Sequence, residues 1–156
     1  KDVGIPPPGD LDPVLHAFRE QAGRVCVGVR ATIERAIQEN VSLVLDGIHL
    51  LPDLLGLDPY RKDALFLWTN LFLTDTQAYA DRFRTRGKTA AHRPRHRYVE
   101  HLDQILKLQD HILDVGEVHG VPAFENVDLD DTLQSLSLHI MDSLRTAAKK
   151  LRANPR

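Results

Sequence analysis

The fold is best approached from the stretch VSLVLDGIHLLP, residues 41–52. Its first half, residues 41–45, is short, apolar and rich in β-branched side chains, which is typical of a strand buried in a parallel sheet. Asp46 and Gly47 follow directly and predict that a strand over residues 42–46 opens into a loop. Ligands of open α/β sheets bind beyond the carboxyl ends of the strands, so Asp46 is a candidate for binding a metal or substrate.

Two further apolar runs resemble buried strands, ALFLWTNLFLTD at about 64–73 and VPAFENV at 121–127. Helical periodicity and capping signals predict helices in the regions between them. The predicted helices cover residues 13–39, about 53–57, 75 to 84 or 86, a stretch after Pro94 that stops at 119–120, and the residues from Asp128 onward. This order predicts an α/β fold, with a parallel sheet covered by helices on both faces.

The composition favours a single domain over residues 1–156, with a proline-rich, irregular entry over residues 1–12. No stretch approaches the roughly 18 uncharged apolar residues of a membrane span, so we expect no membrane partner. The lone cysteine, Cys26, lies on the apolar face of a predicted helix and is expected in the core. A single free cysteine and the lack of a leader pattern together favour a cytoplasmic location.

A basic stretch stands out against the net charge of −2. Residues 82–97 read RFRTRGKTAAHRPRHR, with six arginines, one lysine and no acidic residue. Such a local field attracts anions, and arginine adds planar donors that suit phosphate and carboxylate. We therefore predict that residues 82–97 form a basic, lid-like loop that meets an anionic ligand.

An acid at a strand end and an arginine-rich loop suggest one chemistry in combination. A carboxylate can hold hydrated Mg²⁺, while guanidinium groups neutralise the charge of a phosphoryl group during transfer. In such reactions one well-placed arginine contributes about three to five orders of magnitude in rate. The pairing of Asp46 with the basic loop therefore indicates phosphoryl transfer.

Four motifs in this order resemble the C-terminal half of the 2-phosphoglycerate kinase family, a branch of the P-loop kinases. They are ERAIQENVSLVLDGIHLLP (34–52), YADRFRTR (79–86), RYVEHLDQILKLQDHIL (97–113) and HGVPAFENVD (119–128). The resemblance implies a P-loop kinase-like fold. It also implies an enzyme that uses ATP and Mg²⁺ to phosphorylate 2-phosphoglycerate to 2,3-bisphosphoglycerate.

The resemblance also implies roles for individual residues. Asp46 would act on Mg²⁺ or on the acceptor hydroxyl, although the family more often has Glu-Gly-Val-His where this chain has DGIH. Arg86 would be catalytic, and Asn126 would lie near the nucleotide. The substrate or phosphate ligands would be His49, Arg82, Arg93 and Arg97.

One motif of the family is absent from these 156 residues. No G-x-x-x-x-G-K-[ST] occurs, and Gly87-Lys88-Thr89 is no substitute, since residue 82 is arginine rather than the required glycine. In the family this phosphate loop follows a strand that would lie between the 42–46 and 64–73 strands. We therefore expect the P-loop segment to lie upstream in the same polypeptide or on a second chain, and this chain alone to be inactive.

Other interpretations of these residues stay open. Asp46 fits a turn that closes a strand, and His49 fits a packed loop histidine. The arginine-rich loop fits a nonenzymatic domain that binds anions or nucleic acid, although Phe83 and Tyr98 alone offer little for stacking bases. A kinase of the same class with another acceptor, such as a nucleotide sugar, also fits.

Overall fold

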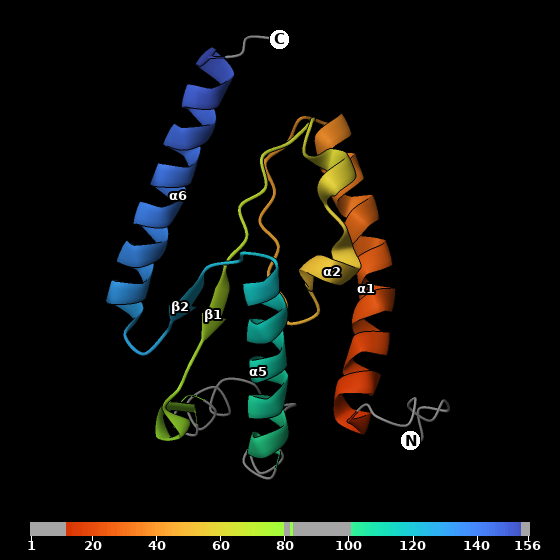
Figure 1. Ribbon diagram of the computed structural model, residues 1–156, viewed down its shortest axis with the longest axis vertical. Helices are drawn as coiled ribbons and strands as arrows, with labels where there is room; N and C mark the ends of the chain where they lie inside the picture. Colours follow the sequence, from red (N-terminus) through yellow and green to blue (C-terminus); the bar gives the residue numbers. More distant parts are fainter. Residues whose placement is uncertain (1–11, 80–81, 83–100, 154–156) are drawn as a thin grey trace. The chain divides into compact units, whose positions relative to one another are not determined.

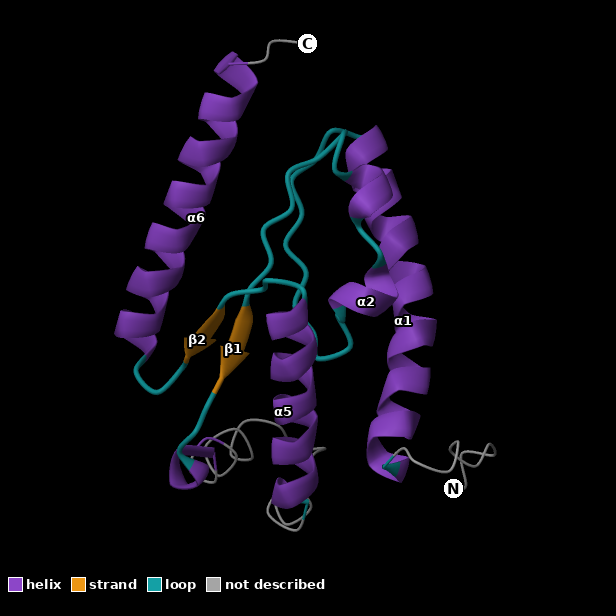
Figure 2. Cartoon of the chain, viewed as in Figure 1, coloured by secondary structure: helices purple, strands orange, loops and turns teal. Residues whose placement is uncertain are grey.

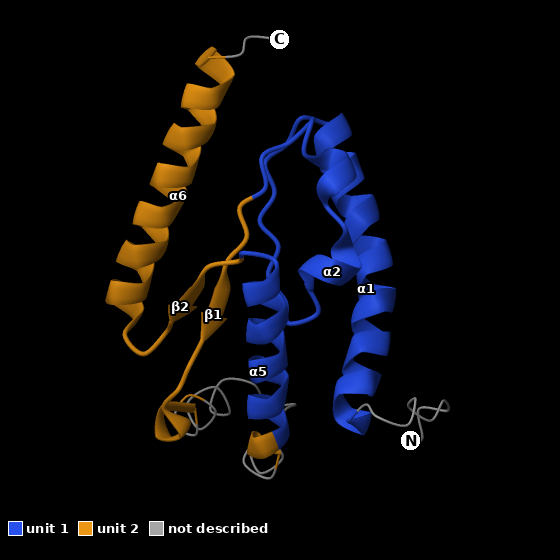
Figure 3. Ribbon diagram, viewed as in Figure 1, with its two compact units in different colours: residues 1–66, 104–120 blue, residues 67–103, 121–156 orange. Residues whose placement is uncertain are grey.

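The computed structural model describes residues 12–79, 82 and 101–153, and these fall into two compact units (Figure 3). The first unit contains the described residues up to Phe66 together with Gln104–Gly120. The second contains the described residues within Leu67–Asp103 and Val121–Arg156. The expectation of a single domain over residues 1–156 stays a prediction.

The first unit begins with the long helix α1, Pro13–Gln38 (Figure 1). Its start follows the predicted signal, since Asp12 Oδ1 accepts hydrogen bonds from the backbone N–H groups of Val14 at 2.8 Å and Leu15 at 3.3 Å. The helix stops next to Asn40, whose φ of 53° lies in the left-handed region that asparagine tolerates. Local sequence signals therefore define both ends of α1.

The core of the first unit is built by α1 and two further helices. The first of these, α2, Pro52–Leu55, contacts α1 and is followed by the 3₁₀ helix η1, Asp58–Tyr60. Helix α5, Leu102–Val118, contributes apolar side chains to the same core and is followed by Gly120 with φ 67°. The buried centre consists of Phe18, Ala22 and Leu51, with Leu54, Leu108 and Ile112 packed against it.

The second unit is built around a parallel pair of strands (Figure 2). Strand β1, Asn70–Phe72, pairs with β2, Ala123–Glu125, and Leu71 lies opposite Phe124 in the register. Helix α6, Leu129–Ala153, contacts β2, and the ring of His139 lies 5.6 Å from that of Phe124. The predicted α/β class with a parallel sheet is confirmed.

The prediction of a third, buried strand over residues 42–46 is wrong. These residues form no strand in the structure, and Val44 and Leu43 are 94% and 44% exposed. Apolar, β-branched composition favours extended backbone, but a strand also needs a neighbour for its N–H and C=O groups, and no described residue pairs with this segment. The other two strands are shorter than predicted, 70–72 instead of 64–73 and 123–125 instead of 121–127.

The two longest helices, α1 and α6, carry charged side chains along much of their length. In α1, for example, Arg35 Nε lies 2.7 Å from Glu39 Oε1, an i,i+4 ion pair on the exposed surface. Within the described part of the chain, no helix is both long enough and apolar enough to cross a membrane.

Candidate functional site

Asp46 directly precedes the turn of the first unit that carries His49. The backbone N–H of Leu50 donates to the carbonyl oxygen of Gly47 at 3.2 Å, which closes this turn over residues 47–50. The side chain of Asp46 is exposed, and it forms no hydrogen bond or ion pair with any described residue. Its carboxylate is therefore open to a ligand.

The surroundings of Asp46 fit only one type of magnesium site. Among the described residues, no group of three His, Cys, Asp or Glu side chains could hold a metal ion. Mg²⁺ in kinases is commonly bound by one or two carboxylates, with water and substrate phosphates completing the shell. A single exposed Asp46 fits that arrangement, and it does not fit a cage made entirely of protein ligands.

His49 is held against helix α1. Its ring stacks on Phe18 with centroids 5.5 Å apart and an interplanar angle of 28°. Its carbonyl oxygen accepts a hydrogen bond from Cys26 Sγ at 3.5 Å. Cys26 is fully buried, as the sequence predicted. His49 itself is half-buried.

Arg19 connects three helices beside the same core. Its Nη2 lies 2.5 Å from Asp53 Oδ2 on α2, and its Nη1 lies 3.4 Å from His111 Nε2 on α5. Burial lowers the pKa of His111, and the nearby Arg19 guanidinium lowers it further, against smaller opposing effects of Asp53 and Asp114. The imidazole is therefore favoured in its neutral form, which accepts a hydrogen bond from Arg19.

This lowered pKa predicts a pH-dependent stability. An ordinary histidine has a pKa of about 6.5, so between this value and the lower folded-state pKa the unfolded chain binds more protons. The contribution of neutral His111 is therefore full above pH of about 6.5 and is lost as the pH falls from this value to the lower folded-state pKa. We expect the free energy of unfolding, measured by urea titration, to decrease over this range.

A pair of variants isolates the contribution of His111. His111→Gln should flatten the pH dependence of unfolding below pH of about 6.5, because it removes the titrating group beside Arg19. His101→Gln removes an exposed histidine just before α5 and should leave the slope as it is. Equal slopes in the two variants would contradict the assignment to His111.

The second unit brings together two other candidates, Arg82 and Asn126. Arg82 Nη2 donates to the carbonyl oxygens of Asn126 and of Val127, the latter at 3.0 Å. The backbone N–H of Asn126 donates to Phe72 O at 2.7 Å, which extends the pairing of β1 and β2. Arg82 thus contacts the backbone of the loop that carries Asn126, the residue that the family resemblance predicts to lie near the nucleotide.

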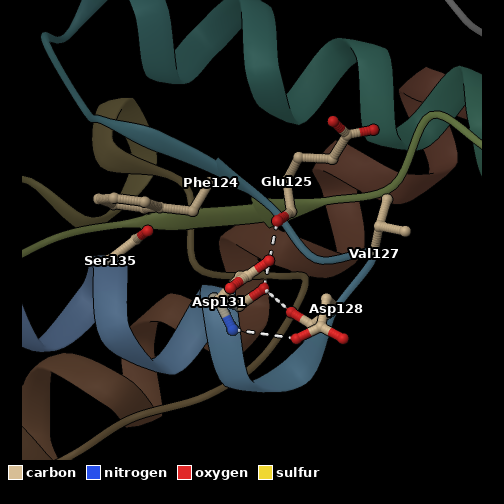
Figure 4. A pocket seen from close by; sticks show the side chains of 7 residues that line it. Phe124, Glu125, Val127, Asp128, Asp131 and Ser135 are labelled. Atoms are coloured by element: carbon tan, nitrogen blue, oxygen red, sulfur yellow. Dashed lines mark hydrogen bonds between the residues drawn. The ribbon is translucent and has the colours of Figure 1, made fainter.

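A cavity of about 270 Å³ lies where this loop enters α6 (Figure 4). Asp128 Oδ1 accepts hydrogen bonds from the N–H groups of Asp130 at 2.9 Å and Asp131 at 3.0 Å, so it caps the helix as predicted. The buried Thr132 donates its hydroxyl to Asp128 O at 2.5 Å. The cavity is lined by Phe124, Glu125, Val127, Asp128, Asp131, Thr132 and Ser135.

The chemistry of this lining favours a ligand that donates hydrogen bonds. Its polar groups are mainly carboxylates, and the ring of Phe124 adds an apolar surface. Two of these carboxylates already have protein partners, since Asp128 Oδ1 caps α6 and Glu125 Oε1 accepts hydrogen bonds from the Thr74 hydroxyl and from the Thr74 N–H. The lining suits an amino group or a heterocycle that carries one better than it suits a phosphate.

Three of the predicted arginines, Arg86, Arg93 and Arg97, lie outside the described residues. Their placement across from Asp46 stays a prediction. Sequence analysis assigned no functional role to Phe18 or to Thr132. The periodicity of α1 placed Phe18 on the apolar face, but nothing local in the sequence signals that its ring meets His49.

The described fold defines the class of the protein as α/β with a parallel strand pair, and comparisons with known proteins narrow this class. No protein-family model matches the chain, and no solved structure matches it. Curated proteins do match. The chain is 35% identical over 137 residues to a 2-phosphoglycerate kinase of Methanothermobacter thermautotrophicus, which covers 87% of this chain and 44% of that protein.

Two more archaeal proteins of the same name give a similar result. The 2-phosphoglycerate kinase of Pyrococcus furiosus is 30% identical over 88% of this chain and 44% of its own length. That of Thermococcus kodakarensis is 28% identical over 88% of this chain and 45% of its own length. The predicted resemblance is confirmed, and the chain spans less than half the length of these curated relatives.

Proposed function

We propose that this chain is part of an ATP-dependent small-molecule kinase that phosphorylates 2-phosphoglycerate or a similar phosphorylated hydroxy acid. The observation that carries the proposal is the similarity of 87% of the chain to the 2-phosphoglycerate kinase of Methanothermobacter thermautotrophicus. The exposed, unpaired carboxylate of Asp46 supports it, because the Mg²⁺ of kinase sites is usually bound by one or two carboxylates together with substrate phosphates.

The proposed reaction forms one bond and breaks another. The acceptor hydroxyl oxygen attacks the γ-phosphorus of ATP and loses its proton, and the bond from that phosphorus to the β,γ-bridging oxygen breaks. The products are 2,3-bisphosphoglycerate and ADP when the acceptor is 2-phosphoglycerate. Bound Mg²⁺ supplies charge neutralisation on the phosphates. Asp46 would hold this ion or orient the acceptor hydroxyl.

The remaining candidates would contact the phosphate groups or the adenine base. Arg86 would stabilise the charge on the transferring phosphoryl group. The phosphates of acceptor and nucleotide would be bound by His49, Arg82, Arg93 and Arg97. Arg82 contributes one Nη to the loop carbonyls, and a guanidinium has five N–H groups, so donors remain for a phosphate. Asn126 and the adjoining cavity would accept the exocyclic amine of adenine.

The proposal places the phosphate-binding G-x-x-x-x-G-K-[ST] segment outside these 156 residues, upstream in the same polypeptide or on a second chain. Two observations support this placement. The chain spans 44% of the length of the Methanothermobacter relative. Apolar side chains of residues 41–48 are exposed, as expected of a segment that a further strand would cover.

The coding sequence upstream of Lys1 provides the test. We expect the longer polypeptide to contain the phosphate loop, to bind MgATP in calorimetry and to convert 2-phosphoglycerate, while the 156-residue chain does neither. A longer polypeptide without such a loop, or one with the loop that transfers no phosphate to 2-phosphoglycerate or a related hydroxy acid, would contradict the proposal. Strongly salt-dependent binding of DNA or RNA by the 156-residue chain would favour the nonenzymatic alternative instead.

A further inference from the structure

The turn that carries His49 is attached to helix α1, whereas the residues before it are exposed. Leu51 is fully buried against Phe18 and Ala22, so the chain after the turn belongs to the core of the first unit. Val44, only a few residues upstream, is 94% exposed. The position of His49 therefore depends on α1 rather than on the segment that leads into the turn.

Two further contacts fasten the residues that follow His49. Arg19 on α1 forms the 2.5 Å ion pair with Asp53. Arg30, also on α1, donates from Nη1 to the carbonyl oxygen of Leu54 at 2.9 Å. Together with the bond from Cys26 Sγ to His49 O, these contacts attach the segment from residue 49 to residue 54 to α1, two of them through backbone carbonyl groups.

The backbone contacts alone would not orient the imidazole of His49. Its orientation is restricted by the ring of Phe18. The Phe18 side chain is 6% exposed and belongs to the core, so its ring is a fixed surface. The His49 ring stacks on it at 5.5 Å with an angle of 28°. The Phe18 ring also meets the His111 ring edge to face, with centroids 6.4 Å apart and an interplanar angle of 87°.

Stacking occupies the face of the imidazole and leaves its edge accessible. The two ring nitrogens lie in the ring plane, and neither forms a hydrogen bond with any residue that the structure describes. His49 is half-buried, so part of the residue faces solvent. A ring whose plane is fixed while both nitrogens are free is prepared to bind an oxygen ligand.

We infer that Phe18 is a positioning residue, which holds the His49 imidazole so that a ring nitrogen binds a phosphate oxygen of the phosphorylated acceptor. The inference rests on the proposed function for the identity of the ligand. The orientation of the ring by Phe18 is a property of the first unit and is measurable without any kinase reaction.

Nuclear magnetic resonance of the imidazole groups in the full chain tests the positioning. The His49 ring signals are identified by their loss in His49→Gln. Phe18→Leu should move them, because the ring current of Phe18 is gone, while Phe18→Tyr keeps an aromatic ring and should leave them near their original positions. Ile33→Ala serves as the stability control, since this buried residue lies 15 positions further along α1, about 22 Å away.

Titration with 2-phosphoglycerate tests the ligand, with inorganic phosphate and ATP as separate probes. We expect 2-phosphoglycerate to shift the His49 signals, and its affinity to fall about two- to tenfold in Phe18→Leu, the range expected when a freed side chain must be ordered on binding. Phe18→Tyr should restore the affinity. A larger response to ATP than to 2-phosphoglycerate would overturn the assignment to the acceptor.

The possible failures are distinguishable. If Phe18→Leu and Ile33→Ala have the same effect on the His49 signals, the loss is general destabilisation and the positioning role is wrong. If 2-phosphoglycerate shifts no His49 signal in the unmodified chain, the ligand assignment is wrong. If it does shift them, while the longer polypeptide shows no kinase activity, the proposed function fails and the positioning role stands.

Discussion

Arg86→Ala, in the polypeptide that includes the phosphate-binding segment, is expected to lower kcat by about three to five orders of magnitude. The negative charge on the transferring phosphoryl group is spread over its equatorial oxygens in the transition state, and an arginine that contacts them acts mainly there. The value of KM for 2-phosphoglycerate should change much less. Steady-state kinetics with a coupled ADP assay measures both.

Arg84→Ala is the matched control for this experiment. It removes the same charge from the same basic stretch, two residues away, at a position to which the family resemblance gives no role. A kinase with a specific catalytic arginine predicts a large loss in Arg86→Ala and a small one in Arg84→Ala. Equal, moderate losses would indicate that the stretch acts only through its overall positive field.

Asp46→Asn is expected to lower kcat/KM by about two to four orders of magnitude, the usual contribution of a group that handles the proton or charge of the reacting oxygen. The carboxylate of Asp46 has no hydrogen-bonding partner among the described residues, so its removal should leave the free energy of unfolding within about 0.5 kcal/mol of the original value. Activity and stability should therefore separate in this variant.

Asp46→Glu keeps the charge and introduces the residue that the resembled family more often has. It should retain activity where Asp46→Asn loses it. If raising the Mg²⁺ concentration restores part of the activity of Asp46→Asn, the carboxylate acts on the metal, and if it does not, the carboxylate acts on the acceptor hydroxyl. Comparable activity of Asp46→Asn and the original enzyme would rule out both roles.

Local signals in the sequence predicted the elements whose structure is determined locally. The Asp12-Pro13 pair, the helical periodicity after it and Asn40 define α1 almost to the residue. Asp128 caps α6 as predicted. The segment 42–46 behaves differently, because whether an apolar extended run becomes a strand depends on a neighbour that the segment itself does not encode.

In the candidate site, too, features set by neighbouring residues could be predicted, and contacts between distant residues could not. Asp46 and His49 lie in one short motif and could be recognised together. Arg82 and Asn126 are 44 positions apart, and although the family resemblance gave each of them a role, no pattern in the sequence predicted their contact. The stacking of Phe18 on His49 was missed because periodicity identifies a buried face but does not identify which distant ring will contact it.

The exposed run at residues 41–48 has a practical consequence for anyone who handles this chain. An extended, β-branched stretch with unpaired backbone groups is a template onto which further copies can add, edge to edge, until fibrils or precipitate form. Asp46 interrupts that stretch with the type of charge that opposes such growth. Neutralising this carboxylate is therefore expected to make the chain aggregate more readily.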